Sequence, residues 1–247
     1  MDFDLTDDQR LLGDSVTKLL SAEYGFEQRK ALLKTPTGWS ETLWQRYAEL
    51  GLLGLPIAED HGGFGGGPVD VMLLMQAFGR HLVLEPYLAT VVLGATALRL
   101  AGNDAQQGEI LPEVAAGTMK LAFAHYERQA RYDLTDILTT ATPKDGGFVL
   151  EGAKSVVLHG DCADRLIVSA RTSGGRDDAG GSRSSWWMGT RPASPAAAMR
   201  CATARGRRRS PSAACRCRGR RCWAKSTTPC PPFSAWSRPA SPPPAPR

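Results

Sequence analysis

The glycine-rich run from Gly62 to Gly67 is the first part of this chain that suggests chemistry. Backbone amides in such a loop can surround a phosphate when the loop follows a strand and opens a helix. Here no strand is predicted before the run, and Gly63, Gly65 and Pro68 do not match the dinucleotide-binding fingerprint. We therefore interpret the run as a tight turn between two helices.

Histidine and cysteine offer the other candidates for catalysis or metal binding. The histidines are scattered, without the spacing of metal ligands: His61, His81, His125 and His159. The sequence holds no GxSxG nucleophile elbow, and Cys162 has no evident base partner. These residue types alone predict neither a metal site nor a catalytic residue.

The first 118 residues have helical patterns. Thr6 and Gln9 have the spacing of a capping box, and apolar residues follow them with a helical period. Further helices are predicted over residues 40–50, from Pro68 onward, and over residues 86–101 and 104–116.

At Lys120 the pattern changes to short β-rich segments. These are Leu121 to Ala124, Ile137 to Thr142, Phe148 to Glu151, Ser155 to Leu158 and Leu166 to Ala170, with a hairpin turn at Asp145-Gly146-Gly147. Helices followed by strands predict an α+β fold, with an all-helical domain over 1–118 and a partial antiparallel β domain over 119–181.

Residues 1–181 have the composition of an ordinary folded protein. They carry 6 Lys and 10 Arg against all 25 acidic residues, a formal net charge of −9, and one cysteine, Cys162. A single cysteine builds no disulfide framework, and Met1-Asp2-Phe3-Asp4 lacks a signal-peptide charge pattern. The most apolar stretch, Leu82 to Leu100, is interrupted by charges and by Pro86. A cytoplasmic location without a membrane span is therefore expected.

Residues 182–247 have a different composition. They contain no Leu, Ile, Val, Asp or Glu, but 13 Arg, 11 Pro and 5 of the 6 Cys of the chain. A segment without branched aliphatic residues cannot build a core, which predicts a disordered, basic, Arg- and Pro-rich tail. The overall charge of +5 comes from this tail and says nothing about the partners of the rest.

The tail also fits a shifted reading frame. When the last base of each codon is read with the first two of the next, Trp186-Trp187 forces Val, Trp187-Met188 forces Asp and Met188-Gly189 forces Gly. The codons before them permit Ile-Ser-Leu-Phe-Leu, so the hidden frame can spell ISLFLVDG, an alternating strand with a turn. We infer one lost base near Gly180–Gly181.

Two other interpretations of the tail stay open. The arginine runs at 205–209 and 216–221 could form a nucleic-acid-binding arm, and the tail cysteines could hold zinc: Cys215, Cys217, Cys222 and Cys230. The tail has no His and no CxxC pair, and aromatic residues do not alternate with its arginines. We favour the shifted frame, and nucleic acid is not an expected partner.

Several segments resemble the acyl-CoA dehydrogenase family in their order and spacing. Leu50 to Gly63 resembles the signature that joins two N-terminal helices of the family, and Leu111 to Gly117 the segment before its β domain. Leu121 to Asp133 resembles its flavin-contact strand and loop, Gly152 to Gly160 its GxKxWITNG strand, and the hidden ISLFLVDG its next strand. The run Ala124 to Leu134 is similar to small subunits of pimeloyl-CoA dehydrogenase-like pairs.

This resemblance implies FAD as cofactor and an acyl-CoA as substrate. In the family, a carboxylate removes the α-proton of the thioester while the β-hydride passes to the flavin. The implied flavin contacts are Phe123, His125, Tyr126, Val156, Val157 and Leu158, with every second side chain of a strand directed to the ring. The catalytic Glu of the family lies in a C-terminal helical domain, and this chain ends before such a domain, so no catalytic residue is expected.

Two family motifs are altered here. TEPxxGSD becomes Tyr126 to Asp133, so that Arg131 and Tyr132 replace the Gly-Ser pair beside the cofactor phosphate. Val156-Val157-Leu158 replaces Trp-Ile-Thr, which removes a stacking ring and a hydroxyl. Arg131 could pair with a phosphate or be a solvated charge. His125 is expected to be a packed strand residue rather than an acid or base.

Three functions are therefore considered. The first is a truncated, frame-shifted acyl-CoA dehydrogenase-like subunit, inactive as printed, from an enzyme for α,β-dehydrogenation of an acyl-CoA. The second is a non-catalytic subunit that completes the site of a paralogue, and the third is a nucleic-acid binder. The expected partners are other acyl-CoA dehydrogenase subunits, in a homo- or hetero-oligomer, and an electron-transfer acceptor.

Overall fold

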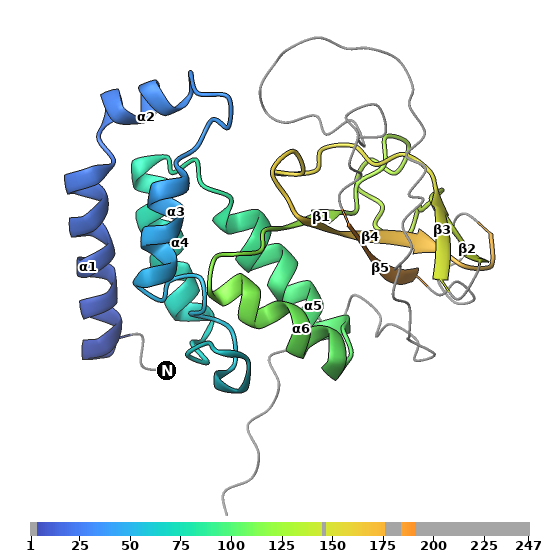
Figure 1. Ribbon diagram of the computed structural model, residues 1–247, viewed down its shortest axis with the longest axis horizontal. Helices are drawn as coiled ribbons and strands as arrows, with labels where there is room; N and C mark the ends of the chain where they lie inside the picture. Colours follow the sequence, from blue (N-terminus) through green and yellow to red (C-terminus); the bar gives the residue numbers. More distant parts are fainter. Residues whose placement is uncertain (1–3, 145–146, 176–183, 191–247) are drawn as a thin grey trace, which may run out of the picture.

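The computed structural model describes residues 4–144, 147–175 and 184–190, and Figure 1 shows a helical part beside a small sheet. The α-helices are α1 (Asp7–Glu23), α2 (Phe26–Leu32), α3 (Glu41–Glu49), α4 (Pro68–His81), α5 (Thr96–Ala101) and α6 (Asp104–Ala115). The chain also forms a 3-10 turn, η1 (Glu59–His61), and a π-helix, η2 (Leu88–Ala95). The strands are β1 (Leu121–Ala124), β2 (Thr140–Lys144), β3 (Gly147–Glu151), β4 (Arg165–Arg171) and β5 (Ser184–Thr190). The predicted α+β class is confirmed.

The helices begin at the signals present in the sequence. Thr6 and Gln9 exchange two hydrogen bonds between side chain and backbone, which is the predicted capping box of α1. Pro68 occupies the first turn of α4 as predicted. Helix α2 is not predicted, because its seven residues include no buried side chain and so show no apolar period.

The glycine-rich run is a turn between helices, as predicted. The amides of residues 64–66 donate to carbonyls of residues 54–57 at 2.7–3.1 Å. A Cβ on Gly63 would lie 2.1 Å from the carbonyl oxygen of Ile57, so only glycine permits this close approach of two backbone segments. The amides that a phosphate would need are already bound within the turn.

The sheet is mixed rather than antiparallel throughout. Its strand order is β1-β4-β2-β3, and β5 also pairs with β4. β4 is parallel to β1 and to β2, whereas β2–β3 and β4–β5 are antiparallel pairs. Parallel neighbours need a long connection between them, and residues 125–164 provide it between β1 and β4.

The sheet differs from the sequence-based expectation at three places. Strand β2 begins at Thr140 rather than at Ile137. The segment from Ser155 to Leu158 is not a strand, because Val156 and His159 both have φ of 51°, which a β ladder does not accommodate. Strand β5 lies beyond residue 181 and overlaps the codons that can spell ISLFLVDG. The rest of the tail, with its arginine runs and cysteines, and the predicted turn at 145–146 lie outside the described residues.

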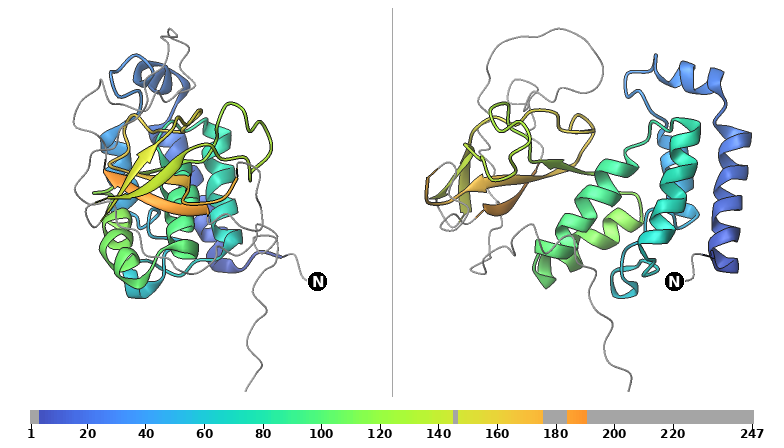
Figure 2. Two further views of the ribbon diagram at one scale, coloured as in Figure 1. Left: turned by 90° about the vertical axis from the view of Figure 1, so that its right-hand side faces the viewer. Right: turned by 180° about the vertical axis from the view of Figure 1, so that it is seen from behind.

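Two cores lie on opposite faces of the sheet. Alternation along β1 places Leu121 in the core formed by the helices, whereas Ala122 packs in a second, smaller core. β4 divides in the same way, with Ile167 on the helical side and Leu166 on the other. Figure 2 shows α5 and α6 between the other helices and the sheet. One face of the sheet is therefore turned toward the helical part.

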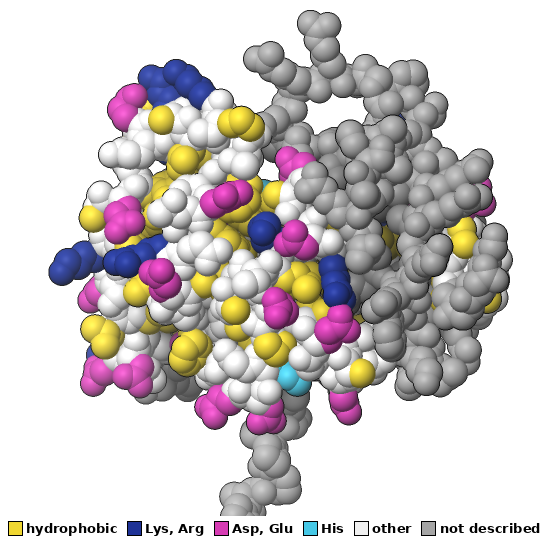
Figure 3. Space-filling model, viewed as in Figure 1, with side chains coloured by type: hydrophobic (Ala, Val, Ile, Leu, Met, Phe, Trp, Pro, Cys, Tyr) yellow, Lys and Arg dark blue, Asp and Glu magenta, His cyan; other side chains and the backbone are white. Residues whose placement is uncertain are grey.

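The described surface of the helical part is acidic, with scattered apolar side chains. Figure 3 shows Asp and Glu side chains spread over this face, with hydrophobic side chains among them. Leu11 of α1 and Phe26 of α2 are 66% and 70% exposed. In the part of the chain that the structure describes, no helix is both long and apolar enough to cross a bilayer.

The helix predicted over residues 86–101 joins the helical part to the sheet. It starts as η2 and continues as α5, and η2 packs against β1. Thr90 Oγ1 donates to the carbonyl oxygen of Leu121 at 3.2 Å and accepts from its amide at 3.3 Å. A Cβ on Gly94 would lie 2.6 Å from Leu121 Cβ. The absence of a side chain at Gly94 therefore allows the η2 backbone to pack directly against Leu121 of β1. This contact sets the position of β1 relative to the helices.

Replacing Gly94 by Ala should destabilise the protein by about 1–3 kcal/mol, because the new methyl group overlaps Leu121. The matched control is Gly108→Ala in α6, where no atom outside the helix backbone lies within 4 Å. That change should stabilise by about 0.5–1 kcal/mol, since Ala is the better helix former. Urea denaturation followed by circular dichroism measures the free energy of unfolding of both variants. Equal changes in the two variants would contradict the close packing of η2 against β1.

Candidate functional site

Aromatic side chains gather where β1 ends. The rings of Phe123 and His125 are nearly parallel, with centroids 5.9 Å apart and an interplanar angle of 13°. Tyr126 meets the His125 ring edge-on at 5.8 Å and is 51% exposed. The structure thus brings three of the expected site residues together as one aromatic group.

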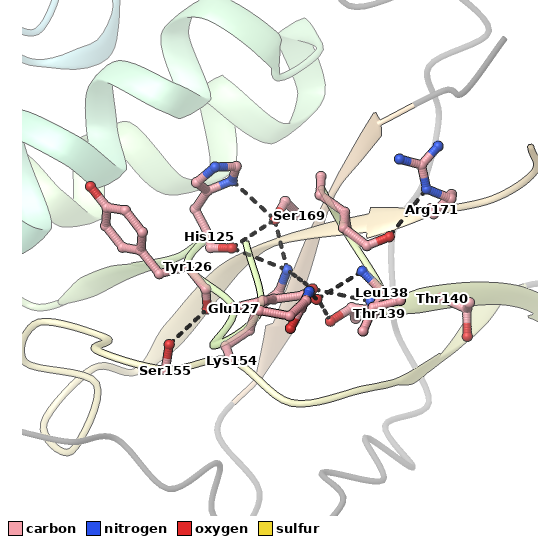
Figure 4. Close-up of polar contacts among 12 residues, drawn as sticks. His125, Tyr126, Glu127, Leu138, Thr139, Thr140, Lys154, Ser155, Ser169 and Arg171 are labelled. Carbon is pink, nitrogen blue, oxygen red and sulfur yellow. Dashed lines mark hydrogen bonds and ion pairs between the residues drawn. The ribbon is translucent and has the colours of Figure 1, made fainter. Parts of the chain in front are cut away.

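A buried ion pair lies beside the aromatic group. Lys154 Nζ is 2.7 Å from Glu127 Oε1, and the two side chains are 1% and 2% exposed. Lys154 Nζ also donates to Ser169 Oγ at 2.8 Å and to the His125 carbonyl oxygen at 3.3 Å. Figure 4 shows these contacts, with the His125 and Tyr126 side chains extending away from them. Three acceptors therefore use the three ammonium protons, as a buried charge requires.

The Glu127 carboxylate is bound through both of its oxygens. Oε1 accepts from the amide and the hydroxyl of Thr139 at 3.1 and 2.6 Å, and Oε2 accepts from Leu138 N and Gln129 Nε2 at 2.7 and 2.6 Å. Burial would raise the pKa of this carboxyl, but the hydrogen bonds from Lys154, Thr139 and Leu138 outweigh it and lower the pKa to about 2. Glu127 is therefore a fixed charge at neutral pH and not a base.

Ser169 connects the ion pair to the His125 ring. Ser169 Oγ is 3.2 Å from His125 Nδ1. Burial lowers the pKa of His125, and the charge of Lys154 lowers it further, although Glu127 opposes the shift. The imidazole is therefore neutral at pH 7, and Ser169 is its partner on the side of the ion pair.

Arg171 holds the segment that supplies amides to Glu127. Its guanidinium donates to the carbonyl oxygens of Ile137 at 3.2 Å and Thr135 at 2.9 Å. Its own amide donates to the carbonyl oxygen of Thr139 at 2.8 Å. These bonds fasten residues 135–139 to the end of β4, where their amides face the carboxylate.

Arg131 and Tyr132 lie in the exposed loop that follows Glu127. Arg131 has φ of 49°, a left-handed conformation, and Tyr132 is 98% exposed. Hydrogen bonds from Ala130 N to Glu127 O and from Asp133 N to Ala130 O close the loop into consecutive turns. Both side chains extend into solvent, so the assignment of both residues to the cofactor site, and of Arg131 to a phosphate, stays a prediction.

The segment from Ser155 to Leu158 lies beside Tyr126. The amide of Ser155 donates to the carbonyl oxygen of Tyr126 at 2.8 Å. Val156 and Leu158 are exposed, whereas Val157 is fully buried in the second core. Val156 and Leu158 can therefore meet a ligand beside Tyr126, and Val157 only packs behind them. A positive φ at the β-branched Val156 is a strained conformation of the kind that concentrates at functional sites.

Sequence reasoning missed the polar centre formed by Glu127, Lys154 and Ser169. Neither Glu127 nor Lys154 lies within a predicted strand, and Glu127 is followed directly by Arg128 and Gln129, so no local pattern marked the two charges as a buried pair. Cys162 offers no chemistry here, because burial raises the pKa of its thiol to about 12. Among the described residues no three His, Cys, Asp or Glu side chains form a group that could hold a metal ion.

Replacing Lys154 by Met should destabilise the protein by about 3–5 kcal/mol at neutral pH, because Glu127 would keep a buried charge without a counter-ion. The control is Arg10→Met, which removes an exposed ion pair with Asp7 and should cost less than about 1 kcal/mol. Urea denaturation gives both values.

The effect of Lys154→Met should also depend on pH. The pKa of Glu127 in the folded protein is about 2, below its ordinary value of 4.5. The stability it provides is therefore complete above the unfolded-state pKa and is lost as the pH falls toward the folded-state pKa. The difference between the variant and the unaltered chain should shrink by about pH 3, and an equal difference at both pH values would contradict a charged pair.

Comparison with known proteins agrees with this architecture. Residues 6–118 match the family described as Acyl-CoA dehydrogenase, N-terminal domain. The chain is similar to benzylmalonyl-CoA dehydrogenase of Aromatoleum aromaticum, with 30% identity over 173 residues, 69% of this chain and 45% of that protein. The chain spans about half the length of the curated relatives that it matches.

Two solved structures extend the likeness to the sheet. One is the ChsE4-ChsE5 complex from Mycobacterium tuberculosis, with 26% identity and a TM-score of 0.67 over 77% of this chain and 49% of that one. The other is acyl-CoA dehydrogenase complexed with FAD from Bacillus anthracis, with 25% identity and a TM-score of 0.66 over 76% of this chain and 31% of that one. Residues 6–118 are therefore an acyl-CoA dehydrogenase N-terminal domain, in a chain whose homologues are named acyl-CoA dehydrogenases.

Proposed function

We propose that this chain is the N-terminal half of an acyl-CoA dehydrogenase-like subunit that binds FAD and, when complete, dehydrogenates an acyl-CoA at its α and β carbons. The aromatic group at the end of β1 is the observation that carries the cofactor assignment. It lies on the sheet face that is turned toward the helices, and the strained backbone at Val156 is beside it. FAD, when bound, supplies the acceptor for the hydride.

The residues at this position fit a flat aromatic cofactor. Half-exposed Tyr126, Val156 and Leu158 offer apolar surface, and the nearly parallel Phe123 and His125 rings make a rigid side. The ion pair behind them holds the backbone of residues 125–127, so these side chains are positioned before a ligand arrives. Arg131 extends from the adjacent loop with a charge that suits a phosphate.

We also propose that the printed chain alone does not catalyse dehydrogenation. The reaction needs a desolvated carboxylate that can take up a proton near neutral pH. Glu127 is the buried carboxylate nearest to the aromatic group, but both of its oxygens are bound and its pKa is about 2. The base would have to come from a further helical domain or from another subunit.

The shifted reading frame near Gly181 is part of this proposal. The codons that overlap β5 can spell ISLFLVDG, a typical strand sequence, in the other frame. The similarity of Ala124 to Leu134 to small subunits of pimeloyl-CoA dehydrogenase-like pairs favours a dicarboxylic acyl-CoA as substrate of the intact enzyme. We propose a homo- or hetero-oligomer with other acyl-CoA dehydrogenase subunits, an electron-transfer acceptor and a cytoplasmic location for it.

The second candidate is a non-catalytic subunit of a heteromeric acyl-CoA dehydrogenase. Two observations favour it: the Gly-Ser pair of the family loop is replaced by Arg131 and Tyr132, and one similar structure, the ChsE4-ChsE5 complex, joins two different proteins. Co-purification with a second acyl-CoA dehydrogenase subunit distinguishes this candidate. Nucleic-acid binding would rest on the arginine runs of the tail alone, which lie outside the described residues.

Replacing Tyr126 by Ala should weaken FAD binding by the full chain about 2- to 10-fold, because a stacking ring is lost. Phe26→Ala is the control, since Phe26 is equally aromatic and exposed but lies on α2, at the far side of the helical part. Quenching of flavin fluorescence in a titration measures both. Equal FAD affinities of the two variants would show that the aromatic group is not part of the cofactor site.

The coding DNA across codons 180–181 should contain one additional base. A chain expressed from the corrected sequence should reduce an acceptor dye with FAD and an acyl-CoA, whereas the printed chain should show no turnover. Sequencing and the dye assay together decide the point. DNA that matches the printed sequence would refute the frame shift, and turnover by the printed chain would refute its inactivity.

A further inference from the structure

The His125 ring lies between the buried ion pair and the face of the sheet that is turned toward the helices. Alternation along β1 places residues 121, 123 and 125 on this face, and Leu121 is part of the helical core. The ring is half-buried and lies almost parallel to Phe123. Its Nδ1 edge is turned to Ser169, so its Nε2 edge points away from the ion pair.

Lys154 determines how the protons near Ser169 are arranged. The ammonium has three protons and no acceptor, and its three neighbours are Glu127 Oε1 at 2.7 Å, Ser169 Oγ at 2.8 Å and the His125 carbonyl oxygen at 3.3 Å. Ser169 Oγ is therefore an acceptor toward Lys154. Its single hydroxyl proton remains to be donated elsewhere.

Two acceptors compete for the hydroxyl proton of Ser169. His125 Nδ1 lies at 3.2 Å, and the His125 carbonyl oxygen lies at 3.5 Å and already accepts from Lys154. The nearer nitrogen is the better acceptor at these distances. A proton on Nδ1 would also face the ammonium charge across one oxygen atom, which disfavours it. The neutral ring therefore accepts at Nδ1 and carries its proton on Nε2.

We propose that Lys154 and Ser169 hold His125 in the Nε2–H tautomer, so that His125 offers a hydrogen-bond donor to an acceptor atom of the cofactor ring. This assignment rests on the proposed binding of FAD at the aromatic group. A donor at such a position favours the electron-rich, reduced form of the ring. Ser169 and Lys154 act as positioning residues, because they determine which nitrogen of His125 carries the proton.

Nitrogen-15 NMR of histidine-labelled full chain without FAD tests the tautomer directly. His125→Gln identifies the His125 signals among those of the four histidines. The unaltered chain should show a protonated Nε2 and an unprotonated Nδ1, and Ser169→Ala should give a mixture of both tautomers. A protonated Nδ1 as the main form in the unaltered chain would overturn the proposal, even if Ser169→Ala fails to fold.

Titration of FAD into His125 variants tests the donor. His125→Leu should bind FAD about 2- to 10-fold more weakly, the loss expected for one hydrogen bond. It should also shift the flavin midpoint potential downward. His125→Gln, whose amide can donate from nearly the position of Nε2, should restore both values. Equal affinity and potential in all three proteins would overturn the donor role.

The two tests separate this proposal from the function on which it rests. If the unaltered chain binds no FAD, the proposed cofactor site is wrong and the contact to the ring falls with it. The NMR result still decides the tautomer, because that measurement uses the chain without cofactor. FAD binding with an Nδ1–H ring would leave the cofactor site standing and refute this inference alone.

Discussion

An ammonium and a carboxylate can be buried together only when every proton and oxygen finds a partner, and Lys154 and Glu127 meet this condition. The pair connects four segments that are distant in the sequence: the exit of β1, the segment before β2, the segment before β4, and Ser169 of β4 itself. The second core beside these segments is small, since five of its nine buried residues are Ala. The connection between β1 and β4 therefore depends on polar contacts to keep its shape.

The same constraint explains how the candidate site is positioned. β1 is held on one side by η2, through Thr90, Gly94 and the backbone of Leu121. At its other end the His125 carbonyl oxygen is held by Lys154. A strand fixed at both ends presents its alternate side chains at defined positions, which is the preorganisation that a cofactor site needs. The strained backbone at Val156 beside Tyr126 belongs to the same arrangement.

The ion pair also prevents Glu127 from acting as a catalytic base. A carboxylate with a pKa near 2 and with both oxygens occupied can stabilise backbone and orient neighbours, but it cannot accept a proton from a substrate. Glu127 therefore serves the structure around the candidate site rather than proton transfer.

Sequence alone determined the elements whose signals are local. The capping box at Thr6, the proline at the start of α4, the glycine turn and the change from helices to strands at Lys120 all involve neighbouring residues, and the structure agrees with them. The resemblance to a family motif also predicted Phe123, His125 and Tyr126 as flavin contacts, and that role stays a prediction. Tertiary structure decided the rest: the parallel pairing of β1 with β4, the irregular path of residues 155–158, and the burial of Lys154 against Glu127. These features arise between residues that are far apart in the chain, where the free energy depends on which partner each buried polar group meets, and no periodic pattern in the sequence records that choice.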